Sequence, residues 1–270
     1  MVVDKKSIAE CNREAWNEAG IYHQKARGNF LVEGFLAPDF TTFNRDCDHI
    51  LRAKLDEIGL AGKTVAQLPC NNGRELLSLI RLGAREGVGF DISDIAIEEA
   101  RKLADISKLN VKFERTDILD IDEKYNNLFD FIYISEGSLQ WFPDLNQYFK
   151  VVAKLLKKNG NILIFEIHPI ALLFETDFQP HNLSLNNILS YFEKGPHNYK
   201  NGLDYIGGKK YDAQPCYWFM HKLSDILNAL TKNKIETLNI NEYNNELANN
   251  STIEQINTIP LSYTLIGKKK

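Results

Sequence analysis

Apolar residues in the middle of the chain gather in five short runs, which are separated by stretches with helical spacing. The runs are Lys63–Pro69, Gly87–Asp91, Val111–Thr116, Phe129–Ser135 and Asn161–Ile167. Short runs that are apolar on both faces are typical of strands buried on both sides of a parallel sheet. The pattern therefore predicts five parallel strands.

The stretches between these runs predict helices. Arg74–Leu82 has helical spacing and Gly83 follows as a stop, Ser93 is placed to cap the next helix, and Leu145–Leu156 forms a third that is predicted to end at Asn159-Gly160. Strand–helix alternation predicts an α/β fold of the Rossmann-like kind, with helices on both faces of the sheet. Ligands of such folds collect at the carboxyl ends of the strands, where the strand order reverses.

The flanking segments differ from this core. Residues 1–60 are predicted to be a mainly helical cap, and residues 169–220 an inserted segment, rich in Asn, Gly, Pro and aromatic residues, that caps the substrate. The core is then 61–168 together with 221–270, where Ile235–Tyr243 and Ile259–Ile266 are predicted strands.

Composition narrows the function classes. The net charge of −4 and the pI near 5.9 argue against a nucleic-acid partner, because such binding normally requires a basic surface. The four cysteines are far apart in sequence, so neither a metal site nor a disulfide framework is expected. No apolar stretch reaches membrane-spanning length and no secretory segment is recognised, so we expect a soluble, cytoplasmic protein with no membrane partner.

Acidic residues end two of the predicted strands. Asp91 follows the second strand, where a carboxylate can accept hydrogen bonds from a ribose diol, and Asp117 follows the third, where it can accept from an exocyclic amine. The alternatives are that Asp91 only stabilises the N-terminus of the following helix, where the helix dipole favours a negative charge, and that Asp117 only caps a loop. The turn that ends in Gly73 has neither GxGxxG nor a P-loop, which argues against NAD, FAD and nucleotide triphosphates.

Two further strand ends carry candidate catalytic groups. Ser135-Glu136 follows the fourth strand, and Trp141 behind it can wall a pocket. His168 follows the fifth strand and, like Glu136, could accept a proton from a nucleophile. A solvated loop carboxylate and a structural histidine are the alternative interpretations.

At this point residues 63–169 resemble the core of class I S-adenosylmethionine-dependent methyltransferases. VAQLPCNNG matches the first motif of that family, which commonly reads VLDLGCGTG, and GVGFDIS, RTD, FDFIYISEGSLQWFPD and LLKKNGNILIFEIHP match later motifs in order. Gln67 stands where the family has an acid, and Pro69 and Asn71 replace two glycines. The resemblance implies a seven-stranded sheet whose last strand is antiparallel.

The chain also resembles an uncharacterised subgroup that carries an NRxxWN helix, here Asn12 to Asn17. The same subgroup has an early Tyr-His pair, here Tyr22-His23, and an HPxALxF run, here His168 to Phe174. The family resemblance implies that S-adenosyl-L-methionine is bound and S-adenosyl-L-homocysteine released. The implied cofactor residues are Tyr22, Pro69, Cys70, Asn71, Gly73, Asp91, Ile92, Asp117, Ile118, Ser135 and Glu136.

The resulting hypothesis is methyl transfer to an O, N or C nucleophile of a small molecule. Glu136 and His168 are the candidate bases, with His221 a weaker third, and the substrate pocket is predicted to contain Trp141, His168, Tyr217, Trp218 and His221. Two alternatives come from other classes: a non-catalytic cofactor-binding or interaction module, and a nucleotide-dependent oxidoreductase on the same fold.

Overall fold

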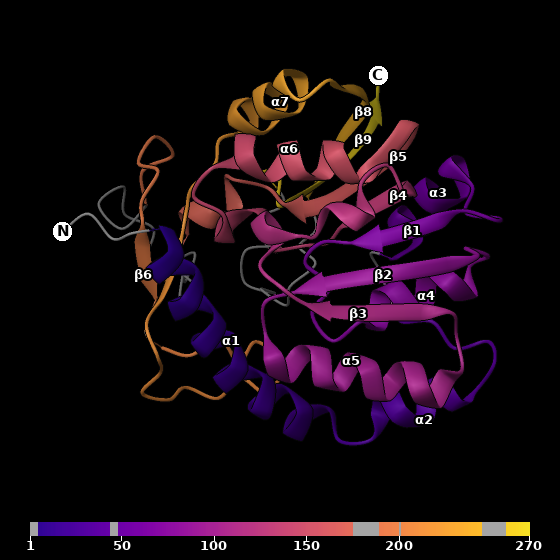
Figure 1. The fold of residues 1–270 in the computed structure, drawn as a ribbon. Helices are drawn as coiled ribbons and strands as arrows, with labels where there is room; N and C mark the ends of the chain where they lie inside the picture. Colours follow the sequence, from indigo (N-terminus) through magenta and orange to yellow (C-terminus); the bar gives the residue numbers. More distant parts are fainter. Residues whose placement is uncertain (1–4, 44–47, 175–188, 200, 245–257) are drawn as a thin grey trace.

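The computed structural model describes residues 5–43, 48–174, 189–199, 201–244 and 258–270. Its centre is a seven-stranded sheet with the strand order β3-β2-β1-β4-β5-β9-β8 (Figure 1). The strands are β1 (Thr64–Gln67), β2 (Glu86–Asp91), β3 (Val111–Arg115), β4 (Phe129–Ile134), β5 (Leu156–Ile167), β8 (Ile235–Tyr243) and β9 (Ser262–Lys269).

The five central strands are parallel, and β9 runs antiparallel to both of its neighbours, β5 and β8. The order reverses at β1, which lies between β2 and β4. The predicted Rossmann-like architecture with an antiparallel last strand is therefore confirmed.

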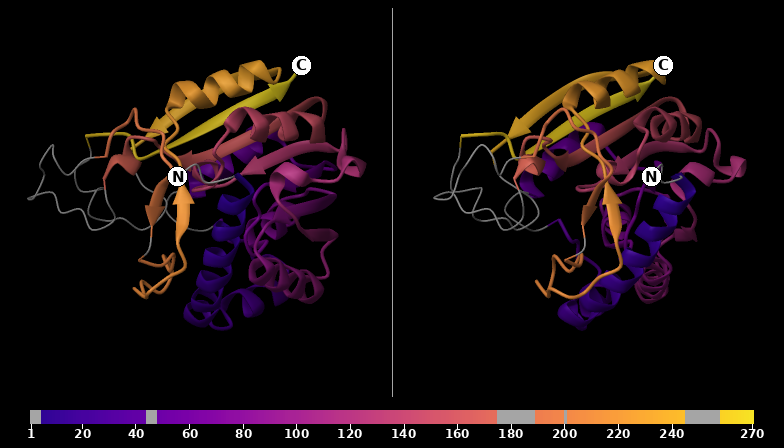
Figure 2. Two further views of the ribbon diagram at one scale, coloured as in Figure 1. Left: turned by 60° about the vertical axis from the view of Figure 1, so that its left-hand side comes forward. Right: turned by 90° about the vertical axis from the view of Figure 1, so that its left-hand side faces the viewer.

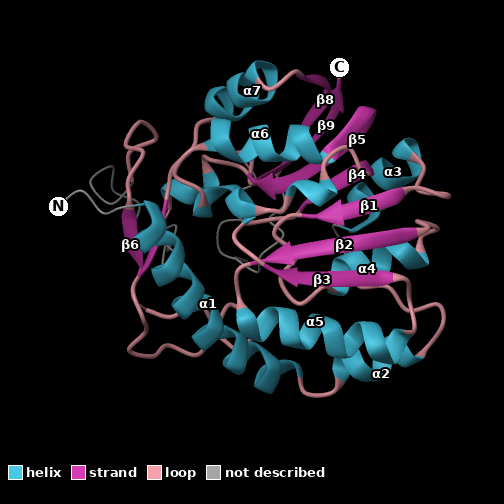
Figure 3. Ribbon diagram, in the orientation of Figure 1, coloured by secondary structure: helices cyan, strands magenta, loops and turns pink. Residues whose placement is uncertain are grey.

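Helices cover both faces of the sheet (Figure 3). On one face α6 (Leu145–Leu155) and α7 (Leu223–Lys232) pack on strand residues such as Ala66 and Ile132. The other face is covered by α2 (Phe30–Leu36), α3 (Asp48–Ile58), α4 (Arg74–Arg81) and α5 (Asp94–Ser107). These helices pack on Val65 and Phe131, the residues that directly precede Ala66 and Ile132 in sequence. Successive strand residues thus feed opposite cores, which explains why the strand runs are apolar throughout.

The predicted end of the helix that starts at Leu145 is wrong, and the last strand spans Ser262–Lys269 instead of the predicted Ile259–Ile266. Helix α6 ends at Leu155 instead of at Asn159-Gly160, and β5 begins at once with Leu156, which is buried and pairs with Phe129. Asn159 has a φ of 64° and lies where the pairing register between β4 and β5 shifts. The residues chosen as a helix stop therefore form an irregularity inside the strand.

Two elements lie beside the carboxyl ends of the parallel strands. The long helix α1 (Lys5–Arg27) runs past them, next to a separate two-stranded sheet of β6 (His197–Tyr199) and β7 (Cys216–Trp218) (Figures 1 and 2). The sheet pairs two parts of a segment that was predicted to be irregular. The sequence neighbours 175–188 lie outside the described residues.

Candidate functional site

A large cavity lies at the carboxyl ends of β1 to β4, under α1 and the segment 197–210. Its volume is about 1890 Å³. A pocket for one small ligand usually measures about 300–1,000 Å³, so this cavity has room for two molecules. Most of the residues that the sequence singled out line it: Pro69, Cys70, Asn71, Asp91, Ile92, Asp117, Ile118, Ser135, Glu136, Trp141 and Trp218.

The turn after β1 is tied to the end of β2. The Asn71 backbone N–H donates to Oδ2 of Asp91 at 2.7 Å, and the Ser93 N–H donates to Oδ1 at 2.9 Å. Asp91 is 8% exposed, and its burial raises the pKa of its carboxyl above the usual value. Both carboxylate oxygens are thus fixed in direction at the edge of the cavity, which suits them for further donors such as hydroxyl groups.

Asp117 and two isoleucines continue this wall. The Asp117 carboxylate accepts the Leu119 N–H at 2.9 Å and caps the short helix η1 (Ile118–Asp120). Burial raises the pKa of Asp117. Ile92 and Ile118, each directly after one of the two carboxylates in sequence, line the same cavity. An apolar wall with an acceptor at its edge can take a flat ring that carries an amine.

The loop after β4 is held by a carboxylate on β5. Glu166, which is 4% exposed, accepts the backbone N–H groups of Ser138 and Leu139, each at 2.7 Å, and that of Gly137. Desolvation nevertheless raises the pKa of Glu166 to about 7. Glu166 therefore shapes the loop that presents Ser135 and Glu136 to the cavity.

Two buried polar atoms near the turn after β1 lack a protein partner. They are Oε1 of Gln67, an acceptor, and Nδ2 of Asn72, a donor, in side chains that are 0% and 1% exposed. A buried polar group without a partner costs about 1–3 kcal/mol. An acceptor and a donor left over in the same strand-to-helix turn are compatible with a ligand that carries both a donor and an acceptor group.

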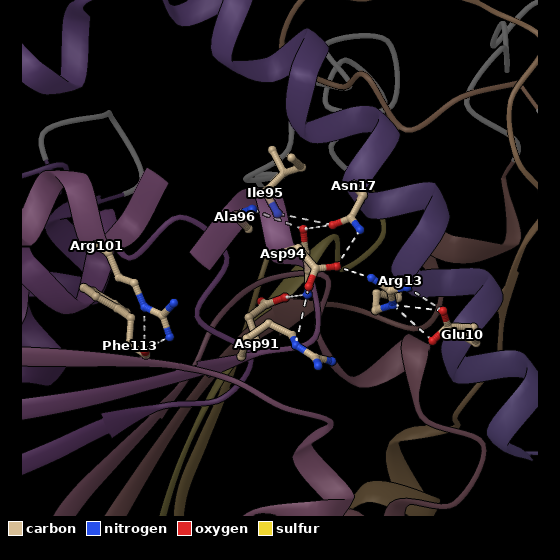
Figure 4. Close-up of polar contacts among 11 residues, drawn as sticks. Glu10, Arg13, Asn17, Asp91, Asp94, Ile95, Ala96, Arg101 and Phe113 are labelled. Atoms are coloured by element: carbon tan, nitrogen blue, oxygen red, sulfur yellow. Dashed lines mark hydrogen bonds and ion pairs between the residues drawn. The ribbon is translucent and has the colours of Figure 1, made fainter. Parts of the chain in front are cut away.

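Helix α1 is fastened to the loop between β2 and α5 (Figure 4). Asn17 donates to Asp94 at 2.8 Å and accepts from the Ser93 hydroxyl at 2.8 Å, and Arg13 pairs with Asp94. One turn earlier, the Asn12 side chain accepts the Tyr217 N–H at 2.7 Å and donates to the Tyr217 carbonyl at 2.9 Å. The NRxxWN segment thus joins α1 to the core and to β7.

Trp16 and His23 of α1 line the cavity as well. Trp16 packs edge-to-face on Trp141 with ring centroids 5.3 Å apart, and His23 packs on Tyr205 at 4.5 Å. His23 donates from Nε2 to the Leu203 carbonyl at 2.9 Å, and burial lowers the pKa of His23 to about 4. At neutral pH its ring is therefore uncharged, with the proton on Nε2 and a lone pair on Nδ1.

His23 and Trp16 were missed as site residues. The sequence signal was present, because both belong to the segments that resemble the uncharacterised subgroup. Their chemistry becomes visible only when α1 docks over the strand ends, which no local pattern predicts.

The two histidines that were predicted, His168 and His221, do not line the cavity. His168 is 3% exposed, bonds to Glu242 through Nε2 at 2.9 Å and accepts the Ile170 N–H on Nδ1 at 3.1 Å. His221 donates from Nε2 to the Phe142 carbonyl at 2.8 Å. Both nitrogens of His168 are occupied, so its position does not support the role of a base.

Three further predicted residues also lie outside the lining. Tyr22 packs on Tyr211 with ring centroids 4.4 Å apart, and Tyr217 is engaged with Asn12 through its backbone. Gly73 has a φ of 74°, and a Cβ there would collide with the ring of Phe113. Gly73 is therefore required by backbone conformation and core packing, instead of by the approach of a ligand.

No group of His, Cys, Asp or Glu side chains in the described ranges is arranged to hold a metal ion. In the same part of the chain, no helix has the length and apolar character needed to cross a membrane.

Comparison with known sequences identifies the family to which the chain belongs. A family model described as a methyltransferase domain matches residues 60–200, just over half of the chain. Over 105 residues, 39% of the chain, the sequence is 30% identical to a tRNA U34 carboxymethyltransferase of Aliarcobacter butzleri. Over 108 residues it is 30% identical to a ribosomal protein L11 methyltransferase of Mannheimia succiniciproducens. These alignments span 34% and 35% of the two relatives' lengths, about a third of each protein.

Comparison with solved structures agrees on the fold. An S-adenosylmethionine dependent methyltransferase from Mesorhizobium loti superposes with a TM-score of 0.63 at 19% identity, over 84% of this chain and 99% of that one. At this level of identity the likeness concerns the fold.

Proposed function

The chain belongs to the methyltransferase-domain family of class I S-adenosylmethionine-dependent enzymes, and from this premise we propose that it transfers a methyl group to a small molecule bound in the same cavity. The observation that carries the proposal is the single cavity that joins Asp91, Asp117 and Glu136. Its size, about 1890 Å³, suits a cofactor and an acceptor side by side.

The residues present fit S-adenosylmethionine, the cofactor of this family. Asp91 would accept the ribose hydroxyls, Ile92 and Ile118 would pack on the adenine, and Asp117 would accept its amine. The leftover acceptor on Gln67 and donor on Asn72 match the ammonium and carboxylate of the amino-acid end.

When bound, the cofactor supplies an activated methyl group, so the protein mainly has to align the acceptor and exclude water. Trp16 and Trp141 would form the wall against which the acceptor lies. Helix α1 covers this wall, and its bonds to Asp94 and Tyr217 keep it in place.

A base is needed only when the acceptor must lose a proton. Glu136 lines the cavity and stays a candidate. His23 takes the place of His168 in our proposal, because it lines the cavity, is uncharged, and has Asp204 3.7 Å behind its Nε2. The Leu203 carbonyl fixes the tautomer whose Nδ1 can accept a proton.

We favour a small acceptor over a macromolecule. Trp16 of α1 and Tyr205 add aromatic surface to the cavity, which suits a small apolar acceptor, and the net charge of −4 gives no attraction for nucleic acid. The two relatives are named for tRNA and for a ribosomal protein, yet only about a third of each relative aligns with this chain.

The test follows a labelled methyl group. The protein is incubated with methyl-labelled S-adenosylmethionine and, in separate reactions, with the small-molecule, RNA and protein fractions of a cell extract. We expect label to enter the small-molecule fraction, and Asp91→Ala to abolish the transfer. Label that enters only RNA or only protein would contradict the small-molecule proposal, and cofactor binding without transfer to any fraction would favour the non-catalytic alternative.

A further inference from the structure

We propose that the amino-acid end of the cofactor is held by two charges on the first turn of α4, Glu75 for the ammonium and Arg74 for the carboxylate, because the acid that the family has at residue 67 is absent. The inference rests on the proposed function and concerns how this chain compensates for its altered first motif. The chemical group recognised is a zwitterionic α-amino acid.

Gln67 is the starting point. Its side chain is 0% exposed at the carboxyl end of β1, and its Nε2 donates to Oε2 of Glu75 at 2.7 Å and to Oγ of Ser135 at 3.2 Å. Both donor positions of the amide are thereby used, and Oε1 is left as a buried acceptor without a partner. Gln67 does not itself line the cavity, but its partner Glu75 does. An ammonium group bound at Glu75 has three donors, one of which would satisfy this acceptor.

Glu75 supplies the charge that Gln67 lacks. It lies within one hydrogen bond of the Gln67 amide and lines the cavity, whereas a carboxylate at position 67 would be fully buried. A charged group is costly to bury, and a half-buried carboxylate beside a neutral amide avoids that cost. The pair can therefore present one negative charge and one neutral acceptor to the same ammonium.

Arg74 can supply the positive charge for the carboxylate of the amino-acid end. Arg74 lines the cavity one residue before Glu75, and the buried Nδ2 of Asn72 is a donor without a partner. A guanidinium and an amide donor together suit a carboxylate. The stretch Asn72 to Glu75 thus offers one positive and one negative charge in succession, which complements a zwitterion instead of an ion with net charge.

The experiment compares two probes by calorimetry. S-adenosylhomocysteine carries the amino-acid end, and 5′-methylthioadenosine has the same adenosine and sulfur without it. For Glu75→Gln and for Arg74→Gln we expect affinity for S-adenosylhomocysteine to fall at least tenfold and affinity for 5′-methylthioadenosine to change less than twofold. Glu98→Gln, an exposed residue on α5, is the matched control and should change neither.

A charge relocation gives a sharper test. The double variant Gln67→Glu with Glu75→Gln moves the carboxylate back to β1, and we expect it to recover most of the affinity that Glu75→Gln loses. Retention of tight S-adenosylhomocysteine binding by Glu75→Gln overturns the inference, and so does an equal loss for both probes, which indicates a purely structural role. Failure of the wild-type protein to bind either probe overturns the proposed function itself and is thus distinguishable. Binding of 5′-methylthioadenosine also reports whether each variant is folded.

Discussion

Asn71 holds the turn after β1 in a conformation that most residues avoid. Its φ is 48°, in the left-handed region, where asparagine is better tolerated than other residues with a side chain. This explains how the chain can replace a glycine of the family's first motif there. The conformation points the Asn71 N–H at Asp91, so the altered turn still connects the ends of β1 and β2.

Asp91→Asn tests this connection. The amide has one acceptor oxygen for two N–H donors, so we expect a loss of about 1–3 kcal/mol in the free energy of unfolding. Affinity for S-adenosylhomocysteine should fall at least tenfold, because an acceptor for the ribose is lost as well. Thermal unfolding with and without ligand measures both effects. Asp105→Asn, on the exposed side of α5, should behave like wild type, and an equally strong effect there would contradict the assignment.

His221 makes stability depend on pH. Burial lowers the pKa of His221 to about 4 in the folded protein, against about 6.5 in the unfolded chain. Because the pKa of His221 is lower in the folded protein than in the unfolded chain, its neutral form contributes stability that is fully present above pH 6.5. This contribution is lost as the pH falls towards 4. His221→Gln can keep the donor to Phe142 without titrating.

The free energy of unfolding of the wild type should therefore fall relative to that of His221→Gln by about 3 kcal/mol between pH 7 and pH 4. Denaturant unfolding at a series of pH values measures the difference. Curves that stay parallel over this range would show that the histidine is not buried as described.

At the scale of elements, α1 depends on a few polar contacts to stay over the cavity. Asn17 bonds to Asp94 and to the Ser93 hydroxyl, and it accepts weakly from the Ile95 N–H at 3.3 Å (Figure 4). Asn17→Ala removes all three bonds while leaving the helix itself intact, because alanine is a good helix former.

We expect Asn17→Ala to raise the dissociation rate of S-adenosylhomocysteine at least fivefold and to change the association rate less. Stopped-flow fluorescence of the tryptophans Trp16 and Trp141, which line the cavity, can follow both rates. Glu14→Ala, on the exposed face of α1, is the matched control. An unchanged dissociation rate in Asn17→Ala would mean that α1 does not retain the ligand.

Some site residues could be predicted from the sequence because of the elements that carry them, and others could not. Asp91 and Asp117 could be placed in one cavity in advance, because parallel strands bring their carboxyl ends to the same edge. His168 also ends a strand, but the docking of β8 brings Glu242 against it, and no local pattern contains that contact. For the same reason His23 and Glu75 were not singled out: their roles depend on α1 packing and on the Gln67 side chain.

At the scale of the whole molecule, the fold itself forms the cavity that is proposed to bind the ligand. The strand order reverses at β1, and the cavity lies at the carboxyl ends of β1 to β4. Asp91 at the end of β2 and Asp117 after β3 line it, and so do residues of α1. The domain division into a helical cap, a core and an inserted segment remains a prediction, although α1 and β7 do lie together over the core.

The most direct measurement is a crystal structure of the protein grown with S-adenosylhomocysteine. We predict electron density for the ribose at Asp91, for the adenine between Ile92 and Ile118 with its amine at Asp117, and for the amino-acid end at Gln67 and Glu75. Density for the ligand at any other place, or a cavity without it at saturating concentration, would contradict the account.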